Sequence, residues 1–409
     1  MNFEDNAQEA SYRAKVRSWI EANKPDLSTL APDQRLIWAE GHKAAMHAFQ
    51  KAKAEAGFAC ISWPEEWGGA GGSQIEEAIF AQEEAHAGLH LPYFMTGLKM
   101  LLPALLEHAD NDLTRARIQP AMRGEEIWCQ LFSEPSSGSD SAGIRTTARR
   151  GGEDEWIVNG QKVWNSGAQF ADFGMLVTRT DPDKPKHKGL TAFWLDMRTP
   201  GVEVRPIKTM AGDSELNEVF LEDVRIPDAQ RIGPVDGGWA VVISTLMNER
   251  AAIGGSAGLN WPEMIDLALA IRTREGSAMD DPAFRDWLAE IYINAQAKRL
   301  LTFRTLTALS RGETPGPEGS ASKLIWTALS QDLSSEALDL LGPFGLIDDP
   351  ELSPLGGAFQ QRFLWSAGIR IGGGTDEIMK NVIAERVLGL PGDVRVDKGV
   401  PFREIPHGR

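Results

Sequence analysis

The sequence is poor in cysteine, in positive charge and in long apolar runs. With only 2 cysteines, Cys60 and Cys129, and 7 scattered histidines among 409 residues, we expect neither a disulfide framework nor a metal centre. The 58 acidic side chains outnumber the 42 basic ones, and a formal net charge of −16 disfavours binding to a phosphate backbone. The longest apolar runs, near 241–247, are far shorter than the roughly 20 residues that span a bilayer. We therefore expect no nucleic-acid partner and no membrane insertion.

The remaining composition is that of a globular protein. Charged residues make up 24% and hydrophobic residues 42% of a chain that is long enough for one large core or for two to three domains. The first residues (MNFED) are acidic and polar, without the basic segment and the apolar segment that form a secretory signal. We therefore predict a cytoplasmic location.

Apolar spacing predicts a multidomain α+β fold followed by a loose polar tail over 392–409. An N-terminal α-helical domain is expected over 1–124, with helices near 9–22, 32–57, 74–90, 96–108 and 111–122. Short β-branched and aromatic runs predict a middle β-barrel or sandwich domain over 125–232, with strands near 126–132, 155–159, 173–180, 190–196, 202–207 and 218–224 and a turn at Asn159-Gly160. A C-terminal helical bundle is expected over 233–391, with helices near 237–274, 282–311, 319–341 and 375–388.

Two segments of the middle part have compositions that suit a ligand. Segment 133–140 (SEPSSGSD) is dense in small and hydroxyl-bearing residues, which let a planar or phosphorylated ligand approach the backbone closely. In segment 162–167 (KVWNSG), a tryptophan beside amide and hydroxyl groups can cover a flat heterocycle and bind its edge. Both also have structural explanations, as an ordinary polar loop and as a core tryptophan before a turn.

Two segments of the last part also stand out. Glu249 falls in an apolar stripe with Val242, Leu246 and Ile253, so its carboxylate is either paired, for example with the adjacent Arg250, or held as a base. Segment 371–378 (IGGGTDEI) predicts a flexible turn in which Thr375 caps the next helix. The turn lacks both the lysine of a phosphate-binding P-loop and a surrounding βαβ unit, so a nucleotide site of either kind is not expected.

In this order and spacing, the four features resemble the acyl-CoA dehydrogenase family, over nearly the whole chain. Each motif is loose by itself, but several in the same order are specific. Three more stretches support the resemblance, namely WPEEWGG at 63–69, the run from NEVF to RIP at 217–227, and AERVLG at 384–389.

The resemblance implies an N-terminal α-helical domain, a middle β domain and a C-terminal four-helix bundle that assembles tetramers. It also implies FAD as the cofactor and an acyl-CoA as the substrate, which is oxidised to a trans-2-enoyl-CoA in lipid or acid degradation. A base removes a proton from Cα while hydride leaves Cβ for flavin N5. Electrons then pass to an electron-transferring flavoprotein.

Individual residues match family positions that contact the cofactor or the substrate. Ser139 matches a position beside both the flavin and the CoA chain. The resemblance implies flavin contacts for Phe132, Ser133, Gly138, Ser139, Trp164, Asn165, Ser166, Thr375 and Glu377.

The sequence departs from the usual position of the catalytic glutamate. Many family members place it two residues before the threonine of the glycine-rich turn, where this chain has Gly373. A minority branch places the base on the helix of the C-terminal domain just before an arginine, and Glu249-Arg250 matches that branch. The resemblance therefore implies Glu249 as the catalytic base, with Arg250 and the Gly373 backbone N–H on the substrate side. Because Gly373 frees volume near the reacting carbons, we expect a bulky or branched acyl group.

A second departure concerns the assembly. The family's Arg-x-x-Phe-Gly motif, whose arginine reaches the FAD of a neighbouring subunit, is replaced by IRTREGS at 271–277, where Arg272 or Arg274 is the expected substitute. Asp339 also stands where the family usually has a glutamine. Such losses are typical of members that pair with a related chain, so both a homo-oligomer and a hetero-oligomer remain open. The alternatives to a dehydrogenase are a non-catalytic or half-site subunit, and an acyl-CoA oxidase or flavin monooxygenase on the same fold.

Overall fold

The computed structural model describes residues 5–31, 34, 37, 39–89, 91–109, 111–255, 261–273, 276–311, 316–317, 319–347, 349, 351–392, 394–395 and 397–405. The chain divides into two compact units. The first comprises Met1–Thr209, Asp213–Glu249 and Val394–Arg409, and the second Met210–Gly212 and Arg250–Asp393. In the described part of the chain, no helix is long and apolar enough to cross a membrane.

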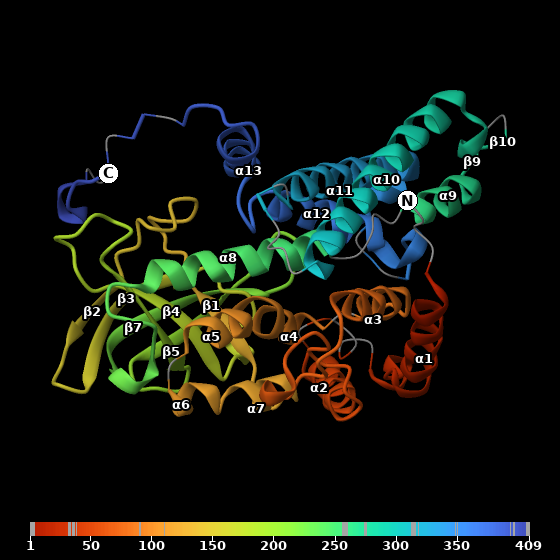
Figure 1. The fold of residues 1–409 in the computed structure, drawn as a ribbon. Coiled ribbons are helices and arrows are strands. Elements are labelled where there is room, and N and C mark those ends of the chain that lie inside the picture. Colours follow the sequence, from red (N-terminus) through yellow and green to blue (C-terminus); the bar gives the residue numbers. More distant parts are fainter. Residues whose placement is uncertain are drawn as a thin grey trace. The chain divides into compact units, whose positions relative to one another are not determined.

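The N-terminal part of the first unit is helical, as predicted (Figure 1). Helices α1 (Ala7–Asn23) and α3 (Gln74–His86) both begin with a capping box. The side chain of the residue before the helix, Asn6 or Ser73, and that of a glutamate three residues later accept hydrogen bonds from each other's backbone N–H groups. Other helices of this part are α2 (Glu40–Glu55), α4 (Pro92–Met95), a π-helical turn (Thr96–Leu101), α5 (Leu102–His108), α6 (Asp112–Arg115) and α7 (Ile118–Met122), with short 3-10 helices at Leu27–Thr29 and Glu65–Trp67. Of the predicted helical residues 32–38, only 34 and 37 lie within the described part.

The middle part forms one mixed sheet of 8 strands in the order β6-β7-β3-β2-β4-β5-β8, with β1 pairing in parallel with β4. Its strands are β1 (Trp128–Leu131), β2 (Thr147–Arg150), β3 (Glu155–Val163), β4 (Phe173–Arg179), β5 (Leu190–Asp196), β6 (Val202–Ile207), β7 (Leu216–Pro227) and β8 (Arg231–Ile232). Strand β2 was not predicted. Only Ala148 of its four residues is buried, so it lacks the apolar signal of a core strand.

The two central strands, β4 and β5, are buried on both faces. Alternate residues such as Met175 and Trp194 pack with the N-terminal helices and with Val241 of helix α8 (Gly238–Gly255). The residues between them, such as Leu176 and Phe193, pack into a second core with side chains of β1, β2, β3 and β7. Because successive side chains of a strand point to opposite faces, a core on each face explains the nearly continuous apolar runs in these strands.

The predicted turn at Asn159-Gly160 is wrong. Strand β3 continues through both residues, and its register with β7 shifts between Val158 and Gly160. A Cβ at Gly160 would lie 2.7 Å from Thr146 Cα, so glycine here permits a β-bulge to approach the neighbouring backbone. In sequence, a bulge glycine after asparagine is indistinguishable from a hairpin signal.

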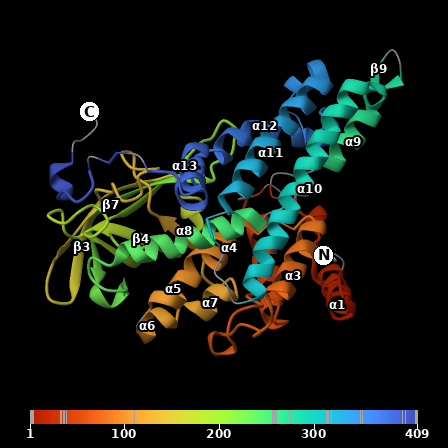
Figure 2. The same cartoon turned by 45° about the horizontal axis from the view of Figure 1, so that its top comes forward.

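The second unit is helical (Figures 1 and 2). Its main elements are α9 (Trp261–Ala270), the hairpin β9 (Arg272–Thr273) and β10 (Gly276–Ser277), α10 (Pro282–Ser310), α11 (Gly319–Leu341), α12 (Ala358–Ile369) and α13 (Asp376–Val382), which a π-helical turn (Ile383–Val387) follows. Apolar residues of α9, α10, α11 and α12 form a single core. The predicted helix over 237–274 is too long, because α9 ends at Ala270 and a hairpin follows. Helix α12 was not predicted.

The expectation of a loose polar tail over 392–409 is wrong for residues 397–405. Residues near Pro401 return to the first unit, where Pro401 forms an isolated β-bridge with Pro185. Phe402 N donates to Lys184 O at 2.9 Å, and Phe402 is buried. The polar composition of the tail concealed this apolar anchor.

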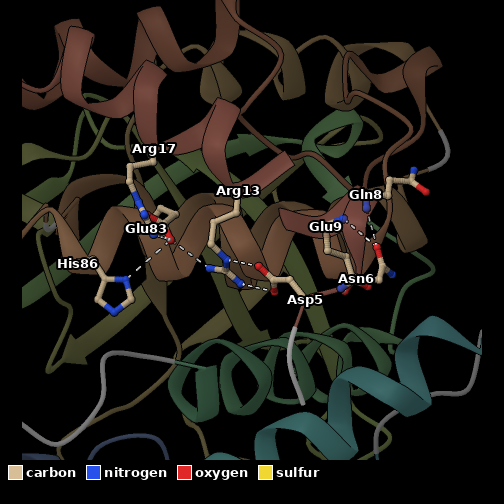
Figure 3. A network of polar contacts seen from close by, with 8 residues as sticks. All are labelled: Asp5, Asn6, Gln8, Glu9, Arg13, Arg17, Glu83 and His86. Carbon is tan, nitrogen blue, oxygen red and sulfur yellow. Dashed lines mark hydrogen bonds and ion pairs between the residues drawn. The ribbon is translucent and has the colours of Figure 1, made fainter. Parts of the chain in front are cut away.

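A buried carboxylate joins helices α1 and α3 (Figure 3). Glu83 accepts from Arg17 Nε at 2.8 Å and from Arg13 Nη1 at 3.1 Å, and Arg13 also binds Asp5. The hydrogen bonds from Arg17 and Arg13 hold the pKa of Glu83 below its ordinary value of 4.5, although burial opposes this shift. The pair therefore contributes stability above about pH 4.5 and loses it as the pH falls through the lowered pKa.

We predict that Glu83→Gln lowers the free energy of unfolding by about 1–3 kcal/mol at pH 7, because it leaves Arg13 and Arg17 without a buried anion. Urea unfolding at pH 7 and at pH 3 would measure this, and the difference should shrink at the lower pH. Glu21→Gln, which removes an exposed pair with Lys24 on the same helix, should change the value by less than about 1 kcal/mol. Equal effects of the two substitutions would refute the prediction.

Candidate active site

A buried ion pair fixes the polar loop at 133–140. Lys162 on β3 is 0% exposed and Glu134 is 5% exposed, and Lys162 Nζ donates to Glu134 Oε1 at 2.9 Å. Lys162 Nζ also donates to Phe132 O at 3.1 Å and to Val177 O at 2.8 Å. Burial lowers the pKa of Lys162, but the Glu134 carboxylate opposes this shift, and the three acceptors match the three donors of an ammonium group, which favours an ion pair.

Glu134 is equally well satisfied. It accepts from the backbone N–H groups of Arg145 at 2.6 Å and Thr146 at 2.9 Å. Burial alone would raise the pKa of Glu134, but the charge and the hydrogen bonds of Lys162, together with those backbone donors, hold it below its ordinary value. The start of the loop is thus anchored to β3, to β4 and to the chain entering β2.

Beyond this anchor the loop opens to solvent. Phe132 is buried and Ser133 is partly buried, whereas Gly138 and Ser139 are exposed. A Cβ placed on Gly138 would meet no atom within 4 Å. The loop therefore combines a fixed base with accessible backbone and hydroxyl groups, as a ligand-contacting loop requires.

Trp164 adopts a conformation that is rare for a bulky residue. Its φ is 63°, in the left-handed region, and the residue is 58% exposed. A large apolar side chain that is strained in backbone and uncovered in side chain is more typical of a ligand surface than of a core position. The core-tryptophan explanation of segment 162–167 is therefore disfavoured.

The residues after Trp164 are held by a long-range hydrogen-bond network. Asn165 is buried, and its Nδ2 donates to Gln130 O at 2.7 Å. Asn165 N donates to Asn217 O at 3.1 Å, and Asn217 Nδ2 donates back to Asn165 O at 2.9 Å. These contacts, from β1 and β7, keep the strained turn at Trp164 in place. Ser166 is partly buried beside them.

Glu249 lies on the core-facing side of α8. It is 9% exposed, and Val241, Val242 and Thr245 on the same face are almost fully buried. The helix starts close to the sheet, since a Cβ at Gly238 would lie 2.8 Å from Ala192 N of β5. The expected stripe is thus present at Val242 and Glu249. The side chains of Arg250 and Ile253 lie outside the described residues.

The glycine-rich turn belongs to the second unit. Gly373 and Gly374 have φ values of 68° and 99°, and Thr375 caps α13 by accepting from Ile378 N at 3.3 Å, as predicted. Buried Lys323 of α11 donates to Gly374 O at 2.7 Å and so fixes the turn against α11. Glu377 is exposed in the first turn of the helix.

The remaining predicted residues stand apart from this turn. Arg272 is exposed on β9, and the β9–β10 hairpin lies at the opposite end of the helical unit from α13 in both views (Figures 1 and 2). Arg274 lies outside the described residues. Asp339 is exposed on α11. Arg272 therefore does not join the Gly373–Glu377 turn within one chain.

Sequence reasoning missed the residues that support these sites. Neither Lys162 with Glu134 nor Asn217 with Asn165 was singled out as a pair. Partners separated by 28 and 52 positions leave no local pattern. The available signal was a lysine inside an otherwise apolar strand, which predicts a buried partner for its charge.

Each unit, taken by itself, has residues whose chemistry suits part of FAD. In the first unit, the exposed Trp164 and the open loop at Gly138 suit a flat heterocycle. In the second unit, the glycine turn capped by Thr375 suits a polar chain or phosphate. The described residues contain no group of three or more histidine, cysteine or acidic side chains that could hold a metal ion.

Comparison with known proteins identifies the class. Models of the acyl-CoA dehydrogenase N-terminal, middle and C-terminal domains match residues 7–125, 129–224 and 236–388. This chain therefore belongs to the acyl-CoA dehydrogenase family, and it is an oxidoreductase of that class.

Relatives and solved structures agree. The acyl-CoA dehydrogenase FadE34 of Mycobacterium tuberculosis is 37% identical over 93% of this chain, which spans 51% of that longer protein. IpdE1 of Mycolicibacterium smegmatis is 33% identical, covering 94% of this chain and 98% of the relative. A structure described as the Tcur3481-Tcur3483 steroid ACAD is 27% identical with a TM-score of 0.81, covering 96% of this chain and 100% of the other. The ChsE4-ChsE5 complex from Mycobacterium tuberculosis is 26% identical with a TM-score of 0.80 and the same coverages.

We predict that Lys162→Met lowers the free energy of unfolding by about 3–5 kcal/mol, because it leaves the Glu134 carboxylate buried without its counter-ion. Urea unfolding would measure the loss. Adding Glu134→Gln to this variant should recover part of it. Arg205→Met, which removes an exposed pair with Glu203 in the same sheet, should cost less than about 1 kcal/mol. A loss for Lys162→Met as small as that of the control would contradict the buried-ion assignment.

Proposed function

We propose that this protein is an FAD-dependent acyl-CoA dehydrogenase in which Glu249 removes the α-proton of an acyl-CoA thioester to give a trans-2-enoyl-CoA. The observation that supports this most directly is the position of Glu249, a carboxylate on the buried face of α8 beside Thr245 and Val242. At Gly373, where many family members have the base, this chain has no side chain to accept a proton.

The chain's own residues have separate roles in this proposal. Glu249 accepts the proton from Cα, and the backbone N–H of Gly373 polarises the thioester carbonyl so that this proton becomes acidic. Arg250 and Ser139 contact the substrate. When bound, FAD would supply the oxidising capacity by accepting hydride from Cβ, which no side chain can do. The expected flavin contacts are those of the Ser133–Asp140 loop, the Trp164–Ser166 turn, and Thr375 with Glu377.

We further propose a bulky, ring-bearing acyl group as the substrate. Glycine at 373 removes a side chain near the reacting carbons. A structural neighbour at 27% identity is described as a steroid ACAD, which supports a substrate of comparable bulk. We also propose an electron-transferring flavoprotein as the electron acceptor, as is usual in this family.

A half-site subunit of a hetero-oligomer is the second candidate. Arg272 lies far from the glycine turn of its own chain, the Arg-x-x-Phe-Gly motif is absent, and two structural neighbours are described by paired chain names. The second unit also exposes large apolar side chains, such as Ile293 at 63% and Leu346 at 89%, which suit an oligomer interface. The FAD-to-chain ratio of the protein purified alone decides between them. A ratio near one supports a self-sufficient oligomer, and a ratio near zero supports dependence on another chain.

We predict that Glu249→Gln reduces turnover by at least about 100-fold while flavin content and melting temperature stay close to those of the wild type, because the amide cannot accept the α-proton. Anaerobic bleaching of the flavin by an acyl-CoA would measure the rate. Glu107→Gln is the matched control, since Glu107 contacts Ser244 on a more exposed side of the same helix and should leave turnover unchanged. Activity of Glu249→Gln within a few-fold of the wild type would remove Glu249 as the base.

We predict a higher kcat/KM for a ring-bearing acyl-CoA than for butyryl-CoA or octanoyl-CoA, because Gly373 leaves space beside the reacting carbons. Steady-state assays with an artificial electron acceptor would compare the three. A preference for either straight chain would contradict the bulky-substrate proposal. Peroxide formed without the acceptor would instead indicate the acyl-CoA oxidase alternative.

A further inference from the structure

The C-terminal segment 397–405 lies beyond residue 388, where the family's C-terminal domain model ends. It nevertheless belongs to the first compact unit. Besides the bridge between Pro401 and Pro185, Arg403 N donates to Pro182 O at 3.0 Å. The segment is therefore attached to the connection between β4 and β5 by regular backbone contacts.

Phe402 is the apolar anchor of this segment. The residue is 6% exposed. The guanidinium carbon of Arg179 lies 3.8 Å from its ring centroid, and that of Arg145 lies 5.2 Å from the same centroid. Arg179 is itself buried, and burial lowers its pKa to about 10. The face of an aromatic ring is a suitable partner for a desolvated guanidinium, because its quadrupole attracts the cation.

Arg179 connects Phe402 to the chain that follows the 133–140 loop. Its Nη2 donates to Ala142 O at 2.6 Å and to Ile144 O at 3.3 Å, and its Nη1 donates to Lys186 O at 2.7 Å. The carbonyls of Ala142 and Ile144 lie directly after the 133–140 loop, and that of Lys186 lies in the connection between β4 and β5. The position of the guanidinium therefore sets the path by which the chain leaves that loop.

A second connection runs through Lys186. Lys186 Nζ donates to both carboxylate oxygens of Asp140 at 2.9 Å and also pairs with Asp397 of the C-terminal segment. Asp140 is the last residue of the loop, and its backbone carbonyl accepts from Ser137 Oγ. The start of the loop is held by Lys162 and Glu134, whereas its end is held by groups that contact the C-terminal segment.

We propose that segment 397–405 is a positioning strap, in which Phe402 and Asp397 orient Arg179 and Lys186 and thereby hold the Ser133–Asp140 loop against its ligand. Phe402 and Asp397 are positioning residues and touch no reacting atom. The inference rests on the proposed function for the identity of the ligand, FAD and the acyl-CoA chain. The geometry of the strap itself does not depend on that function.

The test compares Phe402→Ala and Asp397→Asn with the wild-type holoenzyme. We expect both variants to raise the KM for acyl-CoA by about 5–10-fold with kcat within about 2-fold, because loop position affects binding more than the proton transfer at Glu249. Amide hydrogen exchange over 133–144 should also become faster in both. Phe402→Tyr keeps the ring over Arg179 and should restore wild-type values.

Phe220→Ala is the matched control, because it removes an arginine–aromatic contact with Arg205 elsewhere in the same sheet. It should change neither KM nor exchange over 133–144. Unchanged exchange in Phe402→Ala and Asp397→Asn would overturn the strap, and so would faster exchange with an unchanged KM. A wild-type protein whose flavin is bleached by no acyl-CoA would overturn the proposed function instead, and the exchange comparison would still show whether the segment holds the loop.

Discussion

The candidate ligand loop depends on one buried interaction, the ion pair between Lys162 and Glu134. A fully buried ammonium is costly unless each donor finds an acceptor, and here the end of β1, the loop and β4 each supply one. The ammonium nitrogen of Lys162 on β3 therefore binds the end of β1, the loop and β4 at the same time. Strand β3 ends at Val163, and exposed Trp164 follows directly, so the strand that buries the charge also leads into the exposed tryptophan.

Strain at the candidate site is offset by contacts that come from distant parts of the chain. Trp164 keeps a left-handed backbone because the next residue, Asn165, exchanges hydrogen bonds with Asn217 on β7. The end of the ligand loop is held similarly, through Arg179 and Lys186, by a segment more than two hundred residues further along. A strained or open segment persists only when its surroundings determine its conformation, and both segments meet this condition.

The base proposed for the reaction lies on a helix rather than on the glycine turn. Helix α8 is packed against β5 at Gly238 and buries Val241, Thr245 and Glu249 along one face. A carboxylate on a packed helix is held more precisely than one on a loop. The glycine turn then needs only its backbone, and Lys323 and the Thr375 cap hold it in place.

The sequence by itself determined the order of helical, β and helical parts, the four candidate segments and the family, because apolar periodicity and short motifs are local properties. It did not predict β2, whose side chains are mostly exposed, the bulge at Gly160, or the return of Phe402 to the sheet. Only the tertiary structure decided which residues support the candidate site. Lys162 with Glu134, Asn217 with Asn165 and Phe402 with Arg179 are pairs separated by long stretches of chain, and a contact of that kind depends on how the strands pack rather than on any local pattern.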